Sequence, residues 1–452
     1  MAKVMKSESS VDRISALPDE VLIRILSLLP TKIAVLTSVL SSRWRYLFTS
    51  ISRLKFDADV KNDAKKAKLF MNFIDRVLFF RHRDRPSIVK FCLSWDAFID
   101  PLRIDGWLRA LMFHNIQELY LHNTDDQFEA LPFPASLFSC ETLEILKFNL
   151  WVSHDLQVPA RICLPKLKVL EIEGIGFPDD GSVERLFSSC PVLEDLVLYG
   201  CRFGDHYSKF SISNPSLKRL TLDFRNTDEP DLIVQIIVNA PSLVYLDYCF
   251  TTDYSLVLAD VSSRAKAVIK SESIFAEDFY PVAPDVFRGM RNIQSLEITN
   301  YILYGLWYQK IPLPWLENMN DLKICQWNIN FGSDCLEYLL THCVVLKKLV
   351  LEGYPTIKGT GINYSLKRSS LSPLLSHLKT IEIQSFGMEA ESHMETIKFF
   401  LNNATILEEL TICIKLILPE QQLKIMKELL TLQRASNKCQ VIIDIQNSLL
   451  NF

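Results

Sequence analysis

The sequence predicts an α/β solenoid, in which short repeats stack and each repeat contributes one strand and one return segment. Three observations predict this fold class. Leucine occurs 66 times in 452 residues, whereas glycine occurs only 13 times. The leucines recur at a nearly constant spacing, and apolar and polar residues alternate around them as they do in strands. The chain is 48% hydrophobic with a net charge of −4, which argues against a disordered chain and a polybasic protein.

The repeating unit is the pattern apolar-x-x-apolar-x-apolar. Successive copies start 24 to 32 residues apart, except for one interval of 50 residues that we expect to hide a degenerate copy near Val268. This spacing is typical of leucine-rich repeats, whose period is about 20 to 29 residues. The last two apolar positions lie two residues apart, so both point to the buried face of a strand. The eleven copies start at Ile116, Leu143, Leu167, Leu193, Leu217, Leu243, Ile293, Met319, Leu346, Leu378 and Leu407.

The alignment of the repeats also indicates the role of the cysteines. A single repeat cannot bury its leucines, so the units must stack into a horseshoe-like solenoid with a curved, exposed sheet. Three residues before the strand pattern, alanine and cysteine share one position, which indicates that these thiols are packing residues rather than redox or metal groups. The residues that precede this position in each copy, such as 183–189, are expected to form a short helix on the convex side of the solenoid. The shared position holds Cys140, Cys190, Ala240, Cys343 and Ala404.

We expect an intracellular protein, in the cytoplasm, the nucleus or both. The first ten residues are polar, and no stretch offers the 18 or more apolar residues that cross a membrane. The eleven cysteines are an odd number and form no C-x-x-C pair, which argues against a disulfide framework and a structural zinc site. Reduced thiols, no metal, no cofactor and no membrane partner are expected.

Residues 13–50 precede the repeats and carry the pattern of three short amphipathic helices. Two acidic residues after Pro18 favour a helix start, and Pro30 ends that helix. Thr31 is expected to cap a second helix, and a third carries Trp44. A segment this short buries only a small core on its own. The bundle therefore needs a partner, or the end of the solenoid, to pack against.

The stretch LPDEVLIRILSLLP, followed by SVLSSRWRYLF, resembles the F-box, the motif that docks substrate receptors onto the Skp adaptor of cullin-RING ubiquitin ligases. Ile33 and Leu36 depart from the pattern, because many plant members have Asp and Arg there. The alternative is that the bundle only caps the first repeat. By the resemblance, the residues that insert into the adaptor are Leu17, Pro18, Glu20, Leu22 and Ile25. Those that hold the motif together are Leu29, Val39 and Trp44.

Residues 376–415 read SHLKTIEIQSFGMEAESHMETIKFFLNNATILEELTICIK, and this stretch is similar to the FBD domain of plant F-box proteins. We favour a cap that stacks on the solenoid over a separate binding module. The expected elements are a strand at 378–383, a helix through Ile397, Phe400 and Leu401, a strand at 407–412, a helix at 420–432 and a strand at 440–445. The predicted organisation is a disordered N-terminus at 1–12, an F-box at 13–50, a basic linker and N-terminal cap of the solenoid at 51–110, leucine-rich repeats at 111–370, an FBD at 371–445 and a tail at 446–452.

The segment 51–110 is strongly basic, with 13 Lys or Arg against 8 Asp. A solvated helix face is the favoured interpretation, and a contact with nucleic acid or phosphate is the alternative. The eight histidines are scattered, without H-x-x-x-H, HExxH or G-x-S-x-G, and no Gly-rich phosphate loop is present. No catalytic residue is expected, because other subunits transfer ubiquitin in the family that this chain resembles.

The exposed strand positions are strongly acidic, with only Lys147, Arg219, Lys323 and Lys348 opposing them. This gives the predicted concave face a charge of about −7, which favours a basic or neutral protein partner over nucleic acid or an inositol phosphate. Equally, the acidic residues could merely keep an exposed sheet soluble. The acidic positions are Glu118, Glu171, Glu173, Asp195, Asp223, Asp247, Glu297, Asp321, Glu352, Glu382 and Glu409.

The sequence therefore predicts a substrate-recognition subunit of an SCF-type (Skp-cullin-F-box) ubiquitin ligase. The F-box would bind the Skp-type adaptor and through it the cullin, and the repeats would bind a protein substrate, leading to ubiquitination and proteasomal degradation. The alternative is a leucine-rich-repeat scaffold that acts without a ligase. A small-molecule-dependent receptor would need a basic pocket in the concave face, for which the sequence offers little.

Overall fold

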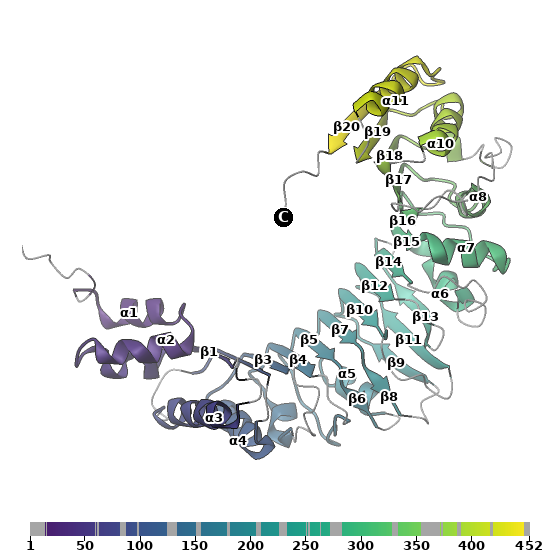
Figure 1. Ribbon diagram of the computed structural model, residues 1–452. Coiled ribbons are helices and arrows are strands. Elements are labelled where there is room, and N and C mark those ends of the chain that lie inside the picture. Colours follow the sequence, from purple (N-terminus) through teal and green to yellow (C-terminus); the bar gives the residue numbers. More distant parts are fainter. Residues whose placement is uncertain are drawn as a thin grey trace, which may run out of the picture. The chain divides into compact units, whose positions relative to one another are not determined.

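Figure 1 shows the computed structural model, which forms two compact units, Met1–Ile175 and Gly176–Phe452. The predicted N-terminal segment 1–12 and residues 447–452 of the predicted tail lie outside the described residues. The structure describes residues 14, 16–58, 60, 63–81, 87–96, 99–123, 133–150, 155–178, 181–204, 209–225, 233–249, 251, 254–262, 264–271, 283–327, 333–353, 371, 374–386, 390–415 and 419–446.

The first unit begins with short helices. The helix α1 (Asp19–Leu26) follows Pro18, and α2 (Thr31–Leu36) follows Pro30. After η1 (Thr37–Val39), the third segment is the 3-10 helix η2 (Trp44–Ser50) rather than an α-helix. Thr31 does not cap α2, contrary to expectation. Its hydroxyl instead accepts a hydrogen bond from the Lys55 backbone N–H at 2.7 Å, which ties α2 to the first strand.

Five strands of the first unit pair in parallel in the order β1-β2-β3-β4-β5, with a helical segment between most of them. Parallel strands joined by return segments are the arrangement that the repeat pattern predicted. The elements are β1 (Arg53–Asp57), α3 (Ala64–Phe79), β2 (Lys90–Trp95), α4 (Pro101–Phe113), β3 (Glu118–Asn123), η3 (Ala135–Ser139), β4 (Ile145–Leu150) and β5 (Val169–Glu173).

The segment 51–110, predicted as a basic linker and N-terminal cap of the solenoid, holds two further strand–helix units. Copies of the apolar pattern start at Ile51 and Ile88, and their apolar positions are buried. The charged residues around both copies, and the long interval between Ile51 and Ile88, concealed them. The two helices of these units are joined by Asp75 on α3, whose carboxylate accepts hydrogen bonds from Arg103 at 2.8 Å and from the Trp107 indole at 2.7 Å.

The second unit continues the same pattern with ten parallel strands. The strand β14 contains Val268, which confirms the degenerate copy expected in the long interval. The strands, in their order in the sheet, are β7 (Asp195–Tyr199), β10 (Arg219–Asp223), β12 (Tyr245–Cys249), β14 (Lys266–Lys270), β15 (Ser295–Thr299), β16 (Asp321–Trp327), β17 (Lys348–Gly353), β18 (Thr380–Phe386), β19 (Glu409–Lys415) and β20 (Gln440–Gln446).

The return segments of the second unit are of two kinds. Short helices precede several strands as expected, among them α5 (Ser182–Ser188), α8 (Ser333–Leu340) and α10 (Ala390–Asn403). Three returns are strands instead, and they form a second parallel sheet in the order β13-β11-β9. The expectation of a helix in every return was wrong there, because runs such as VQIIV favour strand. These strands are β9 (Lys209–Ser213), β11 (Val234–Ala240) and β13 (Tyr254–Val261).

The remaining elements of the second unit are short. They are β6 (Gly176–Phe177), β8 (Arg202–Phe203), α6 (Ala283–Gly289), η5 (Met290–Asn292), α7 (Asn300–Tyr308) and α11 (Pro419–Thr431). The segment predicted as an FBD stacks directly on the repeats, because β17 pairs in parallel with β18, which pairs with β19 and then β20. The expected helix through residues 397–401 is α10, and its three apolar residues are buried.

The interior of both units is built from the repeated apolar positions. The position shared by alanine and cysteine is buried in all five copies, with exposures from 0% to 7%, which confirms a packing role. Burial raises the pKa of the Cys190 thiol to about 12, so it remains protonated. None of the described helices is long and apolar enough to cross a bilayer.

Candidate functional site

The N-terminal helices have a small interior and a large apolar exterior. Leu22 and Leu26 on α1 are buried at 0% and 1% exposure, and Trp44 and Leu47 on η2 are each 7% exposed. Ala34 on α2 completes this interior. Seven aliphatic side chains between Val21 and Leu40 are exposed, and we call them the exposed apolar set. They are Val21, Ile25, Leu28, Ile33, Leu36, Val39 and Leu40.

The structure changes two of the roles that the F-box resemblance implied. Leu22 was expected to insert into an adaptor, but it is completely buried inside the bundle. Val39 was expected to hold the motif together, but it is 82% exposed. The reason is that Leu22 lies on the face of α1 toward the bundle interior, whereas Val39 ends η1 on the outside.

The other predicted residues lie as follows. Pro18, Glu20 and Ile25 are exposed, so they are accessible to a partner, and Leu17 is half-buried. Trp44 is buried, which fits a role in holding the motif together, and Leu29 is half-buried.

A residue that sequence reasoning missed holds the start of α1. The Arg43 guanidinium forms an ion pair with Asp19 at 2.7 Å and also donates a hydrogen bond to the backbone carbonyl of Leu17. No side chain caps the helix at Pro18. Arg43 therefore positions the Leu17–Pro18 turn that the resemblance placed at the adaptor.

The second candidate surface is the face of the strands opposite the buried leucines, which we call the polar face. In the first unit, Lys90 pairs with Glu118 at 3.0 Å, and its Nζ lies 4.0 Å from the centroid of the Tyr120 ring. Lys147 pairs with Glu171 on the adjacent strand at 2.5 Å. The in-register parallel pairing brings these side chains together across neighbouring strands.

Glu173 differs from the other carboxylates of the first unit. Burial raises its pKa, and the neighbouring negative charge of Glu171 raises it further. The Asn149 side-chain amide donates a hydrogen bond to its carboxylate. The surroundings of Glu173 therefore favour the protonated form of its carboxyl group.

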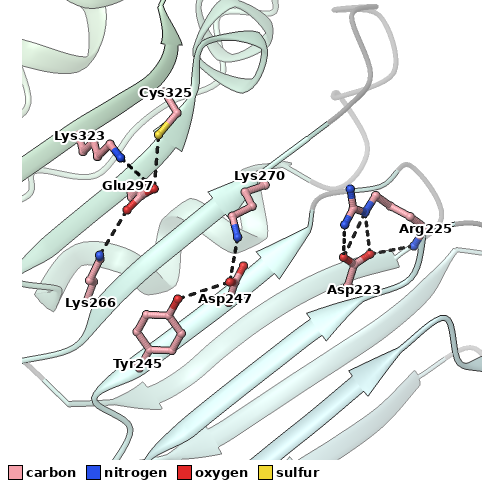
Figure 2. Close-up of polar contacts among 9 residues, drawn as sticks. All are labelled: Asp223, Arg225, Tyr245, Asp247, Lys266, Lys270, Glu297, Lys323 and Cys325. Carbon is pink, nitrogen blue, oxygen red and sulfur yellow. Dashed lines mark hydrogen bonds and ion pairs between the residues drawn. The ribbon is translucent and has the colours of Figure 1, made fainter. Parts of the chain in front are cut away.

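In the second unit, the polar face carries a network across β14, β15, β16 and β17, and Figure 2 shows its members on the first three of these strands. Glu297 on β15 lies between Lys266 at 3.3 Å and Lys323 at 3.6 Å. Lys323 also forms an ion pair with Glu352 at 2.8 Å. The Cys325 Sγ lies 3.4 Å from a carboxylate oxygen of each glutamate.

The charges in this network shift the pKa values of its members. Burial opposes the charged form of Lys323, but the hydrogen bond to Glu352 and the nearby negative charges outweigh it and raise the pKa. The hydrogen bond from Lys323 is the main cause that lowers the pKa of Glu352. Burial would raise the pKa of Glu297, but Cys325, Lys323 and Lys266 together lower it. Burial and the Glu297 charge raise the pKa of the Cys325 thiol to about 12.

Two further aspartates of the polar face are also paired (Figure 2). Asp247 accepts hydrogen bonds from Lys270 at 2.9 Å and from the Tyr245 hydroxyl at 3.4 Å. Asp223 forms a 2.6 Å ion pair with Arg225. All seven acidic residues predicted for a substrate face therefore have a partner, because Asp195 pairs with Arg219.

The polar face is less acidic than predicted. Alternation along the strands places five more basic residues on it, namely Arg53, Lys55, Lys90, Lys266 and Lys270. It adds only two acidic ones, Asp57 and Asp444. The excess negative charge over the described side chains therefore falls from about −7 to about −4. The missed lysines lie in strands whose repeats were missed or degenerate.

Within the described ranges, no group of three or more His, Cys, Asp or Glu side chains could hold a metal ion. The sequence places Cys335 and Cys343 near His342, but both thiols are fully buried. The His342 ring packs against the Trp315 ring, with centroids 5.4 Å apart, and its Nδ1 lies 2.9 Å from the Tyr338 carbonyl oxygen. These contacts make this cluster part of the packing.

Comparisons with known proteins match all three parts of the chain. The F-box domain family matches residues 14–56, and the FBD family matches residues 368–412. The leucine-rich repeats of the FBD-associated F-box protein At5g56370 match residues 104–266. The chain therefore combines an F-box, an α/β leucine-rich-repeat fold and an FBD.

Relatives that match nearly the whole chain are named for two or all three of these parts. The F-box/LRR-repeat protein At3g59200 of Arabidopsis thaliana is 32% identical over 97% of this chain and 89% of its own length. The F-box/FBD/LRR-repeat protein At4g00160 of the same plant is 30% identical over 97% of this chain and 95% of its own length. The chain belongs to this family of plant F-box/FBD/LRR-repeat proteins.

Proposed function

We propose that the protein is the substrate-recognition subunit of an SCF-type ubiquitin ligase. The N-terminal helices bind a Skp-type adaptor, and through it the cullin, while the repeats hold a protein substrate for ubiquitination and proteasomal degradation. The protein itself performs no catalytic step and acts in the cytoplasm, the nucleus or both. The horseshoe curvature of a leucine-rich-repeat solenoid is part of this proposal.

The exposed apolar set is the observation that supports adaptor binding most strongly. Monomeric proteins rarely expose clustered large apolar side chains, and such patches mark protein–protein interfaces. The exposed apolar set lies within residues 21–40, and its Leu28 and Val39 side chains are 81% and 82% exposed. The same segment matches the F-box domain family. Ile33 and Leu36, which depart from the usual pattern, are both exposed and extend this apolar surface.

Co-expression with a Skp-type adaptor tests the adaptor half of the proposal. The unmodified full chain should co-purify with the adaptor, and changing Leu17 and Pro18 together to alanine should remove the complex. Arg43→Ala should weaken it, because Arg43 holds the same turn. A chain that folds but never captures the adaptor would favour the alternative of a repeat scaffold without a ligase.

The polar face is the proposed substrate surface, and its residues remain Glu118, Glu171, Glu173, Asp195, Asp223, Asp247 and Glu297. Because six of these seven residues already form ion pairs, and Glu173 accepts a hydrogen bond from Asn149, a substrate must match alternating charges rather than simply be basic. This observation changes the expectation of a basic or neutral protein partner to one of a protein partner with a mixed-charge surface.

A charge swap tests this surface without losing the ion pair. The double variant Lys147→Glu with Glu171→Lys keeps an opposite-charge contact across β4 and β5 but inverts its pattern. The double variant should no longer capture the proteins that the unmodified chain captures from native extract. The matched control swaps Lys168 and Glu144, a 2.8 Å pair just outside the strands, and should capture them normally. Equal capture by both variants would contradict a recognition role for the polar face.

A further inference from the structure

The helices α3 and α4 of the first unit lie side by side and run in the same direction, because each connects two neighbouring parallel strands (Figure 1). Asp75 on α3 contacts both Arg103 and Trp107 on α4, through hydrogen bonds that span 28 and 32 residues of sequence. Just beyond the helices, burial and the charge of Arg81 lower the pKa of His114. Positions about 30 residues apart in the sequence therefore lie at a similar level on the two helices.

The outer sides of these helices carry the same sequence pattern. It consists of a leucine, an arginine seven positions later and a phenylalanine four positions after that, and it occurs once on each helix. Steps of seven and eleven residues are close to two and three whole turns, so the three side chains lie on one side of each helix. All six residues are exposed, and they are Leu69, Arg76 and Phe80 at α3 and Leu102, Arg109 and Phe113 on α4.

The apolar residues of this surface lie near both ends of the helices. Leu69 and Leu102 are 61% and 76% exposed, and Phe79 and Phe113, the last residues of the helices, are 82% and 79% exposed. Between the leucine and the phenylalanine of α4 stands Gly106. An added Cβ there would have no described side chain within 4 Å apart from those of its two chain neighbours. Gathered apolar side chains of this kind mark a contact surface.

The same surface is basic. The two helices contain six basic residues and two acidic ones. Both acidic residues are already paired, Asp75 with Arg103 at 2.8 Å and Asp105 with Arg109 at 2.7 Å. Three exposed cations of α3 form no ion pair with any residue that the structure describes, and they are Lys65, Lys68 and Arg76. Such a surface attracts a negatively charged partner.

We propose that the outer face of α3 and α4 binds an acidic amphipathic helix of a partner protein. The order along each helix is apolar, cationic, apolar over eleven residues, or about 17 Å. A partner helix of three turns, with apolar residues at both ends and carboxylates between them, matches this order in either direction. The open position at Gly106 leaves room for one of its side chains.

A protein helix fits this face better than a nucleic acid or a bilayer does. A phosphate backbone is bound by cations and polar groups, so it would not use the exposed leucines. A bilayer surface separates apolar side chains from cations by depth. Here Arg76 and Arg109 lie within the same rows as the apolar residues. This contact is separate from the adaptor contact and from the polar face of the strands.

A pair of synthetic helical peptides tests the chemistry of the partner. The first has two leucines eleven positions apart and glutamates four and seven positions after the first leucine, on an alanine-rich background. The second has lysines in place of the glutamates. In isothermal titration, the full chain should bind the glutamate peptide at least tenfold more tightly than the lysine peptide, and added salt should weaken this binding.

Opposite charges at Gly106 test the place of binding. Both Gly106→Glu and Gly106→Lys put a better helix former at a position with open space, so the Tm should not fall. The glutamate variant should bind the glutamate peptide about tenfold more weakly, and the lysine variant several-fold more tightly. Leu102→Asp should lose the peptide but keep the adaptor, which distinguishes this proposal from the proposed ligase role.

Three results would overturn the proposal. The first is no binding of the glutamate peptide at its highest soluble concentration, or equal binding of the two peptides. The second is an equal change of affinity in Gly106→Glu and Gly106→Lys. The third is tighter binding of phosphatidylserine vesicles or of a single-stranded oligonucleotide than of the glutamate peptide.

Discussion

Leu22 and Val39 show how burial separates two residues that look alike in the sequence. Both are apolar and fall at helical spacing, so the pattern alone does not tell which one faces the interior. In the structure, Leu22 packs inside the bundle and Val39 is exposed at the end of η1. Stability and adaptor binding should therefore depend on different residues.

Alanine substitutions should separate these two effects. Leu22→Ala should lower the free energy of unfolding by about 2 to 5 kcal/mol, because it leaves a cavity. Val39→Ala should change it by less than about 0.5 kcal/mol, yet should weaken adaptor binding. Chemical denaturation and a binding titration measure the two quantities. An equal loss of stability in both variants would contradict the placement of Leu22 in the interior and of Val39 on the exposed surface.

The network of Glu297, Lys323 and Glu352 should make stability depend on pH. Both glutamates have folded pKa values below the ordinary value of 4.5, so their contribution is fully present above about pH 4.5 and is lost as the pH falls through the folded values. Lys323→Met should lower the Tm at pH 7 and reduce its fall on acidification. Lys218→Met, which breaks an exposed pair with Glu194, is the control and should have little effect. Identical Tm–pH curves for Lys323→Met and the unmodified chain would contradict this account.

At the scale of elements, the strands were predicted well because alternation with a period of two leaves a clear trace in the sequence. β14 was placed in advance despite its degenerate pattern, whereas β1 and β2 were missed because their apolar positions lie in a segment dense in charged residues. The return strands β9, β11 and β13 were missed, because a short apolar run is compatible with helix or strand until its neighbours are known.

The candidate site was predicted less completely than the fold. The acidic residues of the polar face follow from alternation within each strand. Their partners do not, because Lys90 and Lys266 meet carboxylates only through the register with neighbouring strands. Arg43 was likewise missed, because it contacts Asp19 across 24 residues of sequence.

Thiol reactivity should follow the repeat position. Cys190 is fully buried with a raised pKa of about 12, whereas Cys163 is exposed. Iodoacetamide should therefore modify Cys163 in the native protein and leave Cys190 unmodified until the protein unfolds, as peptide mass spectrometry can show. Rapid native labelling of Cys190 would mean that the repeat position is not a packed interior site.

The contact between α2 and β1 should have a measurable effect. Thr31→Val keeps the shape of the side chain but leaves the Lys55 amide without its acceptor, so it should destabilise the protein by about 1 to 3 kcal/mol. Exchange of the Lys55 amide should also become faster. Thr37→Val, which removes only a local bond to the Ala34 carbonyl, is the matched control. Unchanged hydrogen exchange at Lys55 would show that the Thr31 hydroxyl does not protect this backbone amide of β1.

At the scale of the whole molecule, the proposed function assigns the N-terminal helices to an adaptor and the polar face of the strands to a substrate. Under this proposal the repeats present fixed side chains at regular intervals. Family membership over 97% of the chain places this combination among known F-box/FBD/LRR-repeat proteins. The adaptor contact is the step on which the proposed ligase role depends.

The affinity of the full chain for a Skp-type adaptor tests this central claim most directly. Leu28→Asp places a charge in the exposed apolar set, and Leu102→Asp places one at a similarly exposed leucine of α4, with exposures of 81% and 76%. Isothermal titration should show tight binding by the unmodified chain and by Leu102→Asp, and at least a tenfold loss, about 1.4 kcal/mol, for Leu28→Asp. No binding by the unmodified, folded chain, or equal affinities for the two variants, would contradict the account.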